Sequence, residues 1–237
     1  MVGILQPGYL PWVGFFEQML KSDVFVIYDD VQYDKHGWRN RNRIKGPNGP
    51  VWLTVPVRTT GLNWPRNDQV EIDPTQAKWA AKHLGTLRQH YARAPYFDVY
   101  FPPLSEVIAR PWKRLLDLDL ALIELLAGWL GIEYELVLSS SLAVSDPDPT
   151  GRLVHIISQL GGDVFYEGAS GRNYLDLERF TRAGIRVEFQ NYQPAPYQQQ
   201  YEGFLPFLSA VDLLFNCGRD GKRLLAGLPS AAGSIPG

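Results

Sequence analysis

The first thirty residues contain two short apolar runs separated by a segment with helical periodicity. Residues 1–5 and 24–28 are apolar and β-prone, and apolar side chains recur at helical spacing over residues 12–20. Two strands joined by one helix favour parallel pairing, because parallel strands require a crossover connection. The sequence therefore predicts an α/β protein with a largely parallel sheet flanked by helices.

Strand and helix signals continue to alternate along the chain, without a repeat of fixed period. Further strands are predicted at residues 51–57, 133–138, 163–167 and 187–190, and further helices at residues 76–91, 111–130, 151–160, 175–182 and 206–215. A chain of 237 residues suits one domain with a substantial core. We expect residues 1–227 to form a single α/β domain and the Pro-, Gly- and Ser-rich residues 228–237 to form a flexible tail.

The composition argues against several classes of protein, including nucleic-acid-binding, disulfide-linked and membrane-spanning ones. The formal net charge is −2, so the chain lacks the broad positive field on which nucleic-acid binding depends. The single Cys217 excludes an internal disulfide, and the four histidines have no metal-binding spacing. No apolar stretch reaches the roughly 18 to 20 residues that span a bilayer, and the N-terminus does not resemble a signal peptide. We expect a cytoplasmic protein with no membrane or nucleic-acid partner and no metal site built from cysteines or histidines.

The segment QPGYLPWVGFF, residues 6–16, forms the predicted turn between the first strand and the first helix. In open α/β sheets, ligands bind beyond the carboxyl ends of the strands, and N–H groups at the start of a helix attract phosphate or carboxylate. Glycine lets a ligand approach the backbone closely. We predict that Gln6, Tyr9 and Gly14 bind substrate; the alternative is a purely structural turn packed by aromatic rings.

An acidic pair, Asp29 and Asp30, ends the second predicted strand within DDVQYDK. Carboxylates at a strand end suit a divalent cation, a ribose or an ammonium group, although the spacing matches no known metal loop. We take Asp30 as a candidate catalytic base and Gln32 and Lys35 as substrate contacts. The alternative is that the carboxylates pair with nearby arginines.

The segment HGWRNRNRIK, residues 36–45, is basic and polar. In an extended conformation Arg39, Arg41 and Arg43 would share one face and the two asparagines the other. Arginine forks suit phosphate or carboxylate, so we predict a site for a small anion rather than a nucleic-acid site with a stacking tryptophan. A solvated basic face is the alternative. The predicted substrate contacts are Asn40, Arg41, Asn42 and Arg43.

A second turn, EGASGRNY, residues 167–174, follows a later predicted strand. Its two glycines permit a tight turn that presents N–H groups and a hydroxyl to an anion, although it lacks the lysine of a P-loop. Glu167 is a candidate general base, or else a solvated or capping carboxylate. The predicted substrate contacts in this turn are Ser170, Arg172 and Tyr174.

The last part of the chain carries polar side chains near a predicted helix. Ser209, Asp212 and Asn216 share one helical face, because they are spaced i, i+3 and i+7. That face can line a site or serve to cap and solvate the helix. We include Tyr197, Gln199, Ser209 and Asp212 among the candidate substrate contacts, and we interpret Cys217 as a packed thiol.

Four long strings resemble the WbqC-like protein family and together span nearly the whole chain. They are QPGYLPWVGFFEQ, SDVFVIYDDVQYDKHGWRNRNRIK, GGDVFYEGASGRNYLD and YQQQYEGFLPFLSAVDLLFNCG. Members of this family are found with genes for surface polysaccharides such as O-antigen and for other specialised metabolites. The resemblance implies a biosynthetic enzyme, a group-transfer enzyme acting on a nucleotide sugar or an amine.

The strand, the P-x-x-G turn and the helix are also similar to the nucleotide-binding turn of the HUP nucleotidyltransferases. The motif of that superfamily, HxGH, carries two histidines, and Trp12 and Phe15 stand at the corresponding positions here. Because both histidines are replaced, the similarity implies a shared fold rather than shared phosphate chemistry.

These observations lead to one principal hypothesis and two alternatives. The first is acyl or aminoacyl transfer to an amine such as an amino sugar, with Asp30 or Glu167 as the base and Arg41 and Arg43 holding an anion. No Ser–His or Cys–His pair is readable, which favours direct transfer. The alternatives are a HUP-type nucleotidyltransferase and a non-catalytic binding or scaffold subunit.

The hypothesis leaves the ligands open. The substrate is expected to be small and anionic or nucleotide-linked, or bound to a carrier protein. A nucleotide or CoA-linked donor is compatible with it. The donor, the acceptor, a metal requirement and the oligomeric state stay open.

Overall fold

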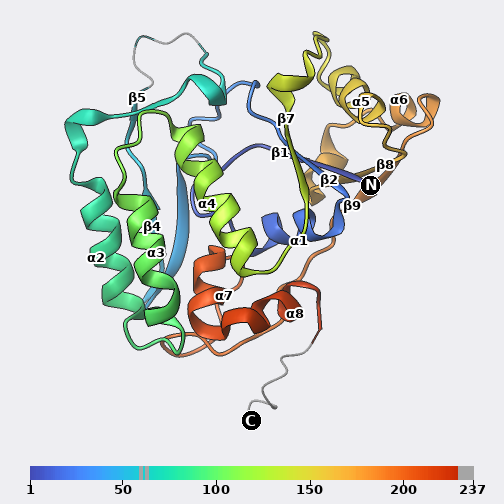
Figure 1. The fold of residues 1–237 in the computed structure, drawn as a ribbon. Coiled ribbons are helices and arrows are strands. Elements are labelled where there is room, and N and C mark those ends of the chain that lie inside the picture. Colours follow the sequence, from blue (N-terminus) through green and yellow to red (C-terminus); the bar gives the residue numbers. More distant parts are fainter. Residues whose placement is uncertain (59–60, 62–63, 229–237) are drawn as a thin grey trace.

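A five-stranded parallel sheet forms the centre of the computed structural model, which describes residues 1–58, 61 and 64–228 (Figure 1). Its strands are β1 (Val2–Leu5), β2 (Val24–Ile27), β7 (Glu135–Leu138), β8 (Val164–Glu167) and β9 (Arg186–Phe189). They lie in the order β7-β2-β1-β8-β9, and every neighbouring pair is parallel. The predicted α/β class with a largely parallel sheet is therefore confirmed.

The strand order reverses direction between β1 and β8. The chain first adds β2 and β7 on one side of β1 and then returns to add β8 and β9 on the other side. In register, Leu5 lies opposite Ile27, and Ile27 lies opposite Leu138, so these strands end at one edge of the sheet. A reversal of this kind is the topological switch point at which open α/β sheets bind ligands. The carboxyl ends of β1 and β8 flank that point.

Helices cover both faces of the sheet. Figure 1 shows α1 (Val13–Lys21), α4 (Leu115–Trp129) and α7 (Ala210–Cys217) on one face and α5 (Pro149–Gln159) and α6 (Leu177–Arg182) on the other. The short α8 (Gly221–Leu225) packs against α1.

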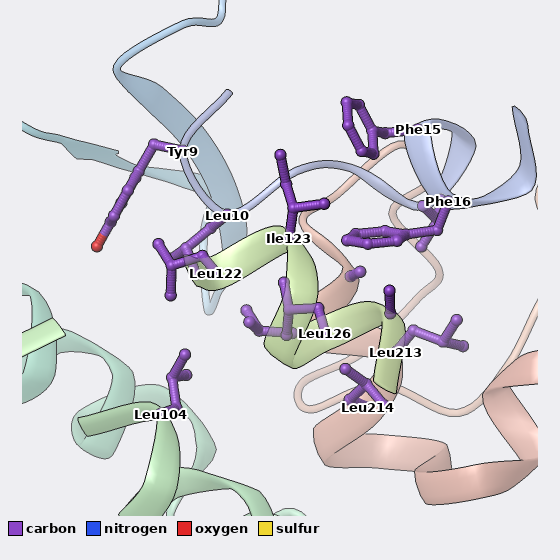
Figure 2. Packing of buried hydrophobic residues seen from close by; sticks show 14 of the residues in the cluster. Tyr9, Leu10, Phe15, Phe16, Leu104, Leu122, Ile123, Leu126, Leu213 and Leu214 are labelled. Carbon is purple, nitrogen blue, oxygen red and sulfur yellow. The ribbon is translucent and has the colours of Figure 1, made fainter. Parts of the chain in front are cut away.

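Each face of the sheet has its own apolar core. Phe15 and Phe16 of α1 pack with side chains of α4 and α7, such as Ile123 and Leu213, in the larger core (Figure 2). The smaller core, under α5 and α6, contains Val26, Ile156 and the stacked rings of Phe165 and Phe180.

A second group of elements lies between β2 and α4 in sequence. The antiparallel hairpin of β3 (Arg41–Gly46) and β4 (Gly49–Thr54) is followed by a small pair, β5 (Val57–Arg58) and β6 (Glu71–Ile72). The helices α2 (Trp79–Tyr91) and α3 (Phe97–Ala109) come next. The 3₁₀ turns of the described chain are Asn67–Gln69, Pro74–Gln76, Ser139–Leu142, Ala169–Asn173 and Gly218–Asp220.

The sequence predicted this group only in part: the strand expected at residues 51–57 forms, as β4, but not in the parallel sheet. The strand predicted at residues 51–57 lies in the hairpin, and the polar segment before it is its partner strand. Helix α3 was not predicted, because Pro102 and Pro103 lie inside it and proline ordinarily interrupts a helix. It forms nevertheless, since Phe97, Phe101, Leu104 and Ile108 bury their side chains in the core.

The predicted helix at residues 111–130 begins only at Leu115, and Gly131 follows it with a φ of +61°, as a C-terminal glycine does. No helix within the described ranges is long and apolar enough to cross a membrane. The predicted tail lies, apart from Leu228, outside the described residues.

Candidate functional site

A cavity of about 330 Å³ opens at the carboxyl end of β1, beside the switch point of the sheet. We call it the β1 cavity. It is built from the end of β1, the first turn with the start of α1, the chain entering β3, and one residue of the segment before α7. Its lining residues are Leu5, Gln6, Gly8, Pro11, Trp12, Phe15, Trp38, Arg39, Asn42, Arg43 and Phe207.

Aromatic rings form much of the wall. The Trp12 ring lies 5.8 Å from the ring of Phe207 and 6.2 Å from that of Tyr192. Gly14 makes room for Trp12, because a Cβ at Gly14 would lie only 1.9 Å from the indole. The first turn of α1 already uses N–H groups, since Val13 donates to the Leu208 carbonyl at 3.2 Å. The turn at residues 6–16 is therefore held by aromatic packing around Trp12 as well as by the backbone hydrogen bond of Val13.

Arg39 and Arg43 line the cavity and Arg41 lies beside it, each without a carboxylate within ion-pair distance among the described residues. Arg39 donates to the Pro7 carbonyl at 3.2 Å, Arg43 to the Phe207 carbonyl at 3.4 Å, and Arg41 to the Gly37 carbonyl at 3.1 Å. None of the three forms an ion pair in the part of the chain that the structure describes. Their positive charge is thus available to an anionic ligand, with forks suited to phosphate or carboxylate.

The β3 strand separates the predicted basic residues into two groups. Arg41 and Arg43 share one face of the hairpin, opposite Thr54 and Trp52 in register, and Arg39 precedes the strand. Arg39 and Arg43 line the cavity, whereas Arg41 does not. Asn42 lines the cavity and its side-chain oxygen accepts the Arg43 N–H at 2.8 Å, while Asn40 is buried and donates to the Val55 carbonyl at 2.7 Å.

Glu167 ends β8 on the other side of the switch point. The residue is 6% exposed, and its carboxylate accepts the Tyr174 hydroxyl at 2.9 Å. Burial raises the pKa of Glu167 to about 7. Gly171 permits this placement, since a Cβ there would lie 2.3 Å from the Glu167 side chain. Ser170 and Arg172 are exposed.

The acidic pair, Asp29 and Asp30, links the end of β2 to the segment after β7 and to α5. Asp29 accepts hydrogen bonds from the Ser140 amide at 3.0 Å and the Ser140 hydroxyl at 2.6 Å, beyond the end of β7. Asp30 accepts the Ser139 hydroxyl and forms an ion pair with Arg152 of α5. The alternative of pairing with an arginine is thus found for Asp30, with an arginine from α5.

Asp212 lies in the core. It accepts the hydroxyls of Tyr91 and Tyr197, each at 2.7 Å, and the Gln199 amide at 2.8 Å. Ser209 is buried and caps α7. This polar face therefore anchors the segment that leads into α7.

The structure brings only part of the predicted site together. Gln6, Asn42 and Arg43 line the β1 cavity, and Gly14 and Arg41 lie next to lining residues. Tyr9 is fully buried and its hydroxyl lies 2.9 Å from His83 Nδ1. The predicted site residues outside the cavity lining also include Asp30, Gln32, Lys35, Asn40, Glu167, Ser170, Arg172, Tyr174, Tyr197, Gln199, Ser209 and Asp212.

Sequence reasoning missed the aromatic wall as a site feature. Trp12 and Phe15 were available as signals, because they occupy the two histidine positions of the HxGH pattern. Phe207 gave no signal, because it reaches the cavity from a segment distant in sequence.

Asp119 of α4 is a buried carboxyl group near the site. It is 1% exposed, and neither oxygen has a hydrogen-bond partner among the described residues. Burial raises its pKa well above the usual range, and the charge of Arg39 opposes this shift. Such a group is rare in proteins and indicates a protonated carboxyl in the folded chain.

We expect Asp119→Asn to change how stability depends on pH. The pKa of Asp119 is higher in the folded chain than in the unfolded chain. The wild-type carboxyl therefore stabilises the fold most below its unfolded pKa. As pH rises toward the folded pKa, this stability is lost by up to about 1.4 kcal/mol per pH unit. The variant lacks this loss, so its free energy of unfolding in urea, relative to the wild type, should grow as pH rises above about 4. An advantage that does not change with pH would contradict a protonated Asp119.

Comparison with known proteins places this site in a family. A model of the WbqC-like protein family matches residues 6–224, which include every residue lining the cavity except Leu5. A Mycobacterium tuberculosis protein described as uncharacterized is 35% identical over 226 residues, covering 94% of this chain and 96% of that protein. No solved structure matches. The chain belongs to the WbqC-like protein family.

Proposed function

We propose that the protein is a biosynthetic group-transfer enzyme that holds an anionic substrate in the β1 cavity. The observation that carries this proposal is the group of three arginines without carboxylate partners beside an aromatic-walled cavity at the switch point. Two of these arginines, Arg39 and Arg43, line the cavity, and their buried Nε atoms have no hydrogen-bond partner among the described residues, so an anionic ligand would complete their bonding.

The reaction we favour is acyl or aminoacyl transfer to an amine, such as an amino sugar, in the synthesis of a surface polysaccharide or a specialised metabolite. The amine nitrogen forms a bond to the carbonyl carbon of the donor, and the bond from that carbon to the leaving group breaks. The proton lost by the amine passes to a base and then to the leaving group, so atoms and charge balance.

Glu167 is the better of the two candidate bases. A base is most effective when its pKa lies near the working pH, and burial raises the pKa of Glu167 to about 7. Asp30 is instead engaged by Arg152 and Ser139, which stabilise its carboxylate and occupy its oxygens. Glu167 ends the strand adjacent to β1 and does not line the β1 cavity, so in this proposal the acceptor amine lies at the end of β8, between the cavity and Glu167.

Nucleotidyl transfer of the HUP type is the second candidate, favoured by the strand order and by a cavity at the switch point. Against it, Trp12 and Phe15 line the cavity where the HxGH pattern has histidines, so the wall is apolar where phosphate would be activated. A non-catalytic binding or scaffold subunit is the remaining alternative, and it predicts binding without turnover.

A thermal-shift screen tests the proposal. The ligands are ATP and CTP with magnesium, CoA and acyl-CoA, and nucleotide-linked amino sugars. A ligand at 100 times its Kd should raise the melting temperature by about 5 to 10 °C. We expect Arg43→Ala to weaken binding at least about tenfold, because it removes a charge-assisted contact.

Arg182→Ala is the matched control, because Arg182 is exposed on α6 and pairs with Glu178. Its melting shift with each ligand should equal that of the wild type. If Arg43→Ala and Arg182→Ala bind the same ligand equally well, the β1 cavity is not the binding site. If a ligand binds but no acceptor is turned over, the scaffold alternative replaces group transfer.

A further inference from the structure

We propose that an exposed pair of tryptophans beside the β1 cavity stacks the base of a nucleotide-linked substrate. The site consists of Trp38, Arg41, Arg43 and Trp52, which we call the indole plate. It deepens the proposed function, on which it rests, by naming the class of the anionic substrate.

The indole plate is built by the register of the hairpin. Arg43 lies opposite Trp52 in the β3–β4 ladder, so the two side chains share the outer face. The rings of Trp38 and Trp52 are 5.0 Å apart with an angle of 36° between their planes. The Arg43 guanidinium lies 5.0 Å from the Trp38 ring and 5.8 Å from the Trp52 ring, and Arg41 lies 5.1 Å from Trp52.

Both indoles keep large surfaces in contact with solvent. Trp38 is 42% exposed and Trp52 is 46% exposed. Tryptophan is usually well buried, and two adjacent exposed indoles leave favourable apolar burial unrealised. The guanidiniums of Arg41 and Arg43 lie over the rings and so place positive charge beside the exposed indole surface. An aromatic surface joined to unpaired arginines suits a ligand with a flat ring and a negative charge.

The plate continues into the β1 cavity. Trp38 and Arg43 belong to both, whereas Trp52 and Arg41 lie outside the cavity lining. At about 330 Å³ the cavity is at the small end of ligand pockets, which run from about 300 to 1,000 Å³. A whole nucleotide-linked compound therefore extends beyond it. The base lies on the plate, the phosphates lie at Arg43 and Arg41, and the transferred group enters the cavity toward Asn42 and Gln6.

A single nucleotide fits these observations better than a nucleic-acid strand. A strand needs a basic track along several phosphates, whereas two arginines, Arg41 and Arg43, border the indole plate and the net charge of the chain is −2.

Calorimetric titration with base-containing and base-free anions tests the inference. The probes are UDP, ADP, ribose 5-phosphate and inorganic pyrophosphate. We expect the nucleotides to bind at least about tenfold more tightly than the base-free anions, because stacking of one base on an aromatic ring contributes at least that factor in affinity. Trp52→Leu should remove that difference without changing ribose 5-phosphate binding, and Trp52→Phe should keep most of it. Nucleotides should also quench tryptophan fluorescence.

Trp64→Leu is the matched control, because Trp64 is 72% exposed and does not line the cavity. It should bind nucleotides as the wild type does. Equal affinity for nucleotides and base-free anions would overturn the indole plate and leave the anion site of the proposed function intact. No binding of any of the anions, or of the acyl compounds, would overturn both. Tighter binding of a short single-stranded RNA than of a mononucleotide would replace the nucleotide with a strand.

Discussion

Glu167→Gln is expected to lower kcat for amine acylation by about 10²- to 10⁴-fold, the contribution of a positioned general base. The amide is close in size to the carboxyl group and can still accept the Tyr174 hydroxyl, so the local structure should persist. Binding of the anionic donor should change little, because Glu167 does not line the β1 cavity. Steady-state kinetics with the ligand identified by the thermal screen, together with its Kd, measures both quantities.

The pH dependence distinguishes a base from a structural carboxylate. Because the pKa of Glu167 is raised to about 7, kcat/KM of the wild type should rise about tenfold per pH unit below pH 7 and level off above it. The pH profile of Glu167→Gln should lack this rise below pH 7. The same raised pKa stabilises the folded state below the unfolded pKa near 4.5, and this stability is lost as pH rises toward 7.

Glu188→Gln on β9 is the control, because Glu188 is partly exposed and pairs with Arg186 rather than facing the switch point. Its rate and pH profile should match the wild type. If Glu167→Gln keeps its activity and its rising limb, then Glu167 is not the base, and Asp30 becomes the residue to substitute next.

The parallel sheet could be predicted because its signals are local. β1 and β2 are short apolar runs bounded by turn residues, while β7, β8 and β9 combine apolar residues with one or two charged ones, and the structure places all five in one sheet. The hairpin was harder, since its first strand, Arg41–Gly46, alternates arginine with residues that only the tertiary fold buries. Helix α3 contradicts the usual effect of Pro102 and Pro103, because its phenylalanines gain more from burial than the prolines cost.

The candidate site was predictable to a similar degree. Gln6, Asn42 and Arg43 were found because turns after parallel strands and arginine-rich segments carry recognisable chemistry. The cavity wall could not be predicted, because Phe207 contributes from a segment without regular structure and Arg39 reaches the cavity only through the turn before β3. Contacts across such sequence distances leave no periodic signal.

Asp212→Ala should cause the largest loss of stability, about 3 to 5 kcal/mol. The substitution removes the acceptor of Tyr91, Tyr197 and Gln199 together, and all three donors are buried or partly buried. That loss is a large fraction of the 5 to 15 kcal/mol by which domains are usually stable. Urea unfolding followed by circular dichroism should show a lower midpoint with an unchanged slope.

Two further variants separate the hydrogen-bond network from the loss of a charge. Asp212→Asn keeps one acceptor oxygen and should cost less than the alanine variant, whereas Glu106→Ala, on the exposed face of α3, should change stability by no more than about 0.5 kcal/mol. Equal losses for the alanine and asparagine variants would mean that charge, not acceptor geometry, holds the network.

The Asp212 network also supports the cavity. It anchors the segment before α7, in which the Leu208 carbonyl accepts from Val13 and the Ser209 amide donates to the Arg43 carbonyl at 2.9 Å. Loosening that segment frees Phe207, one wall of the β1 cavity. In Asp212→Ala, ligand affinity should therefore fall even at temperatures where the chain is still folded. Unchanged affinity in the folded variant would show that the cavity wall is held independently of this network.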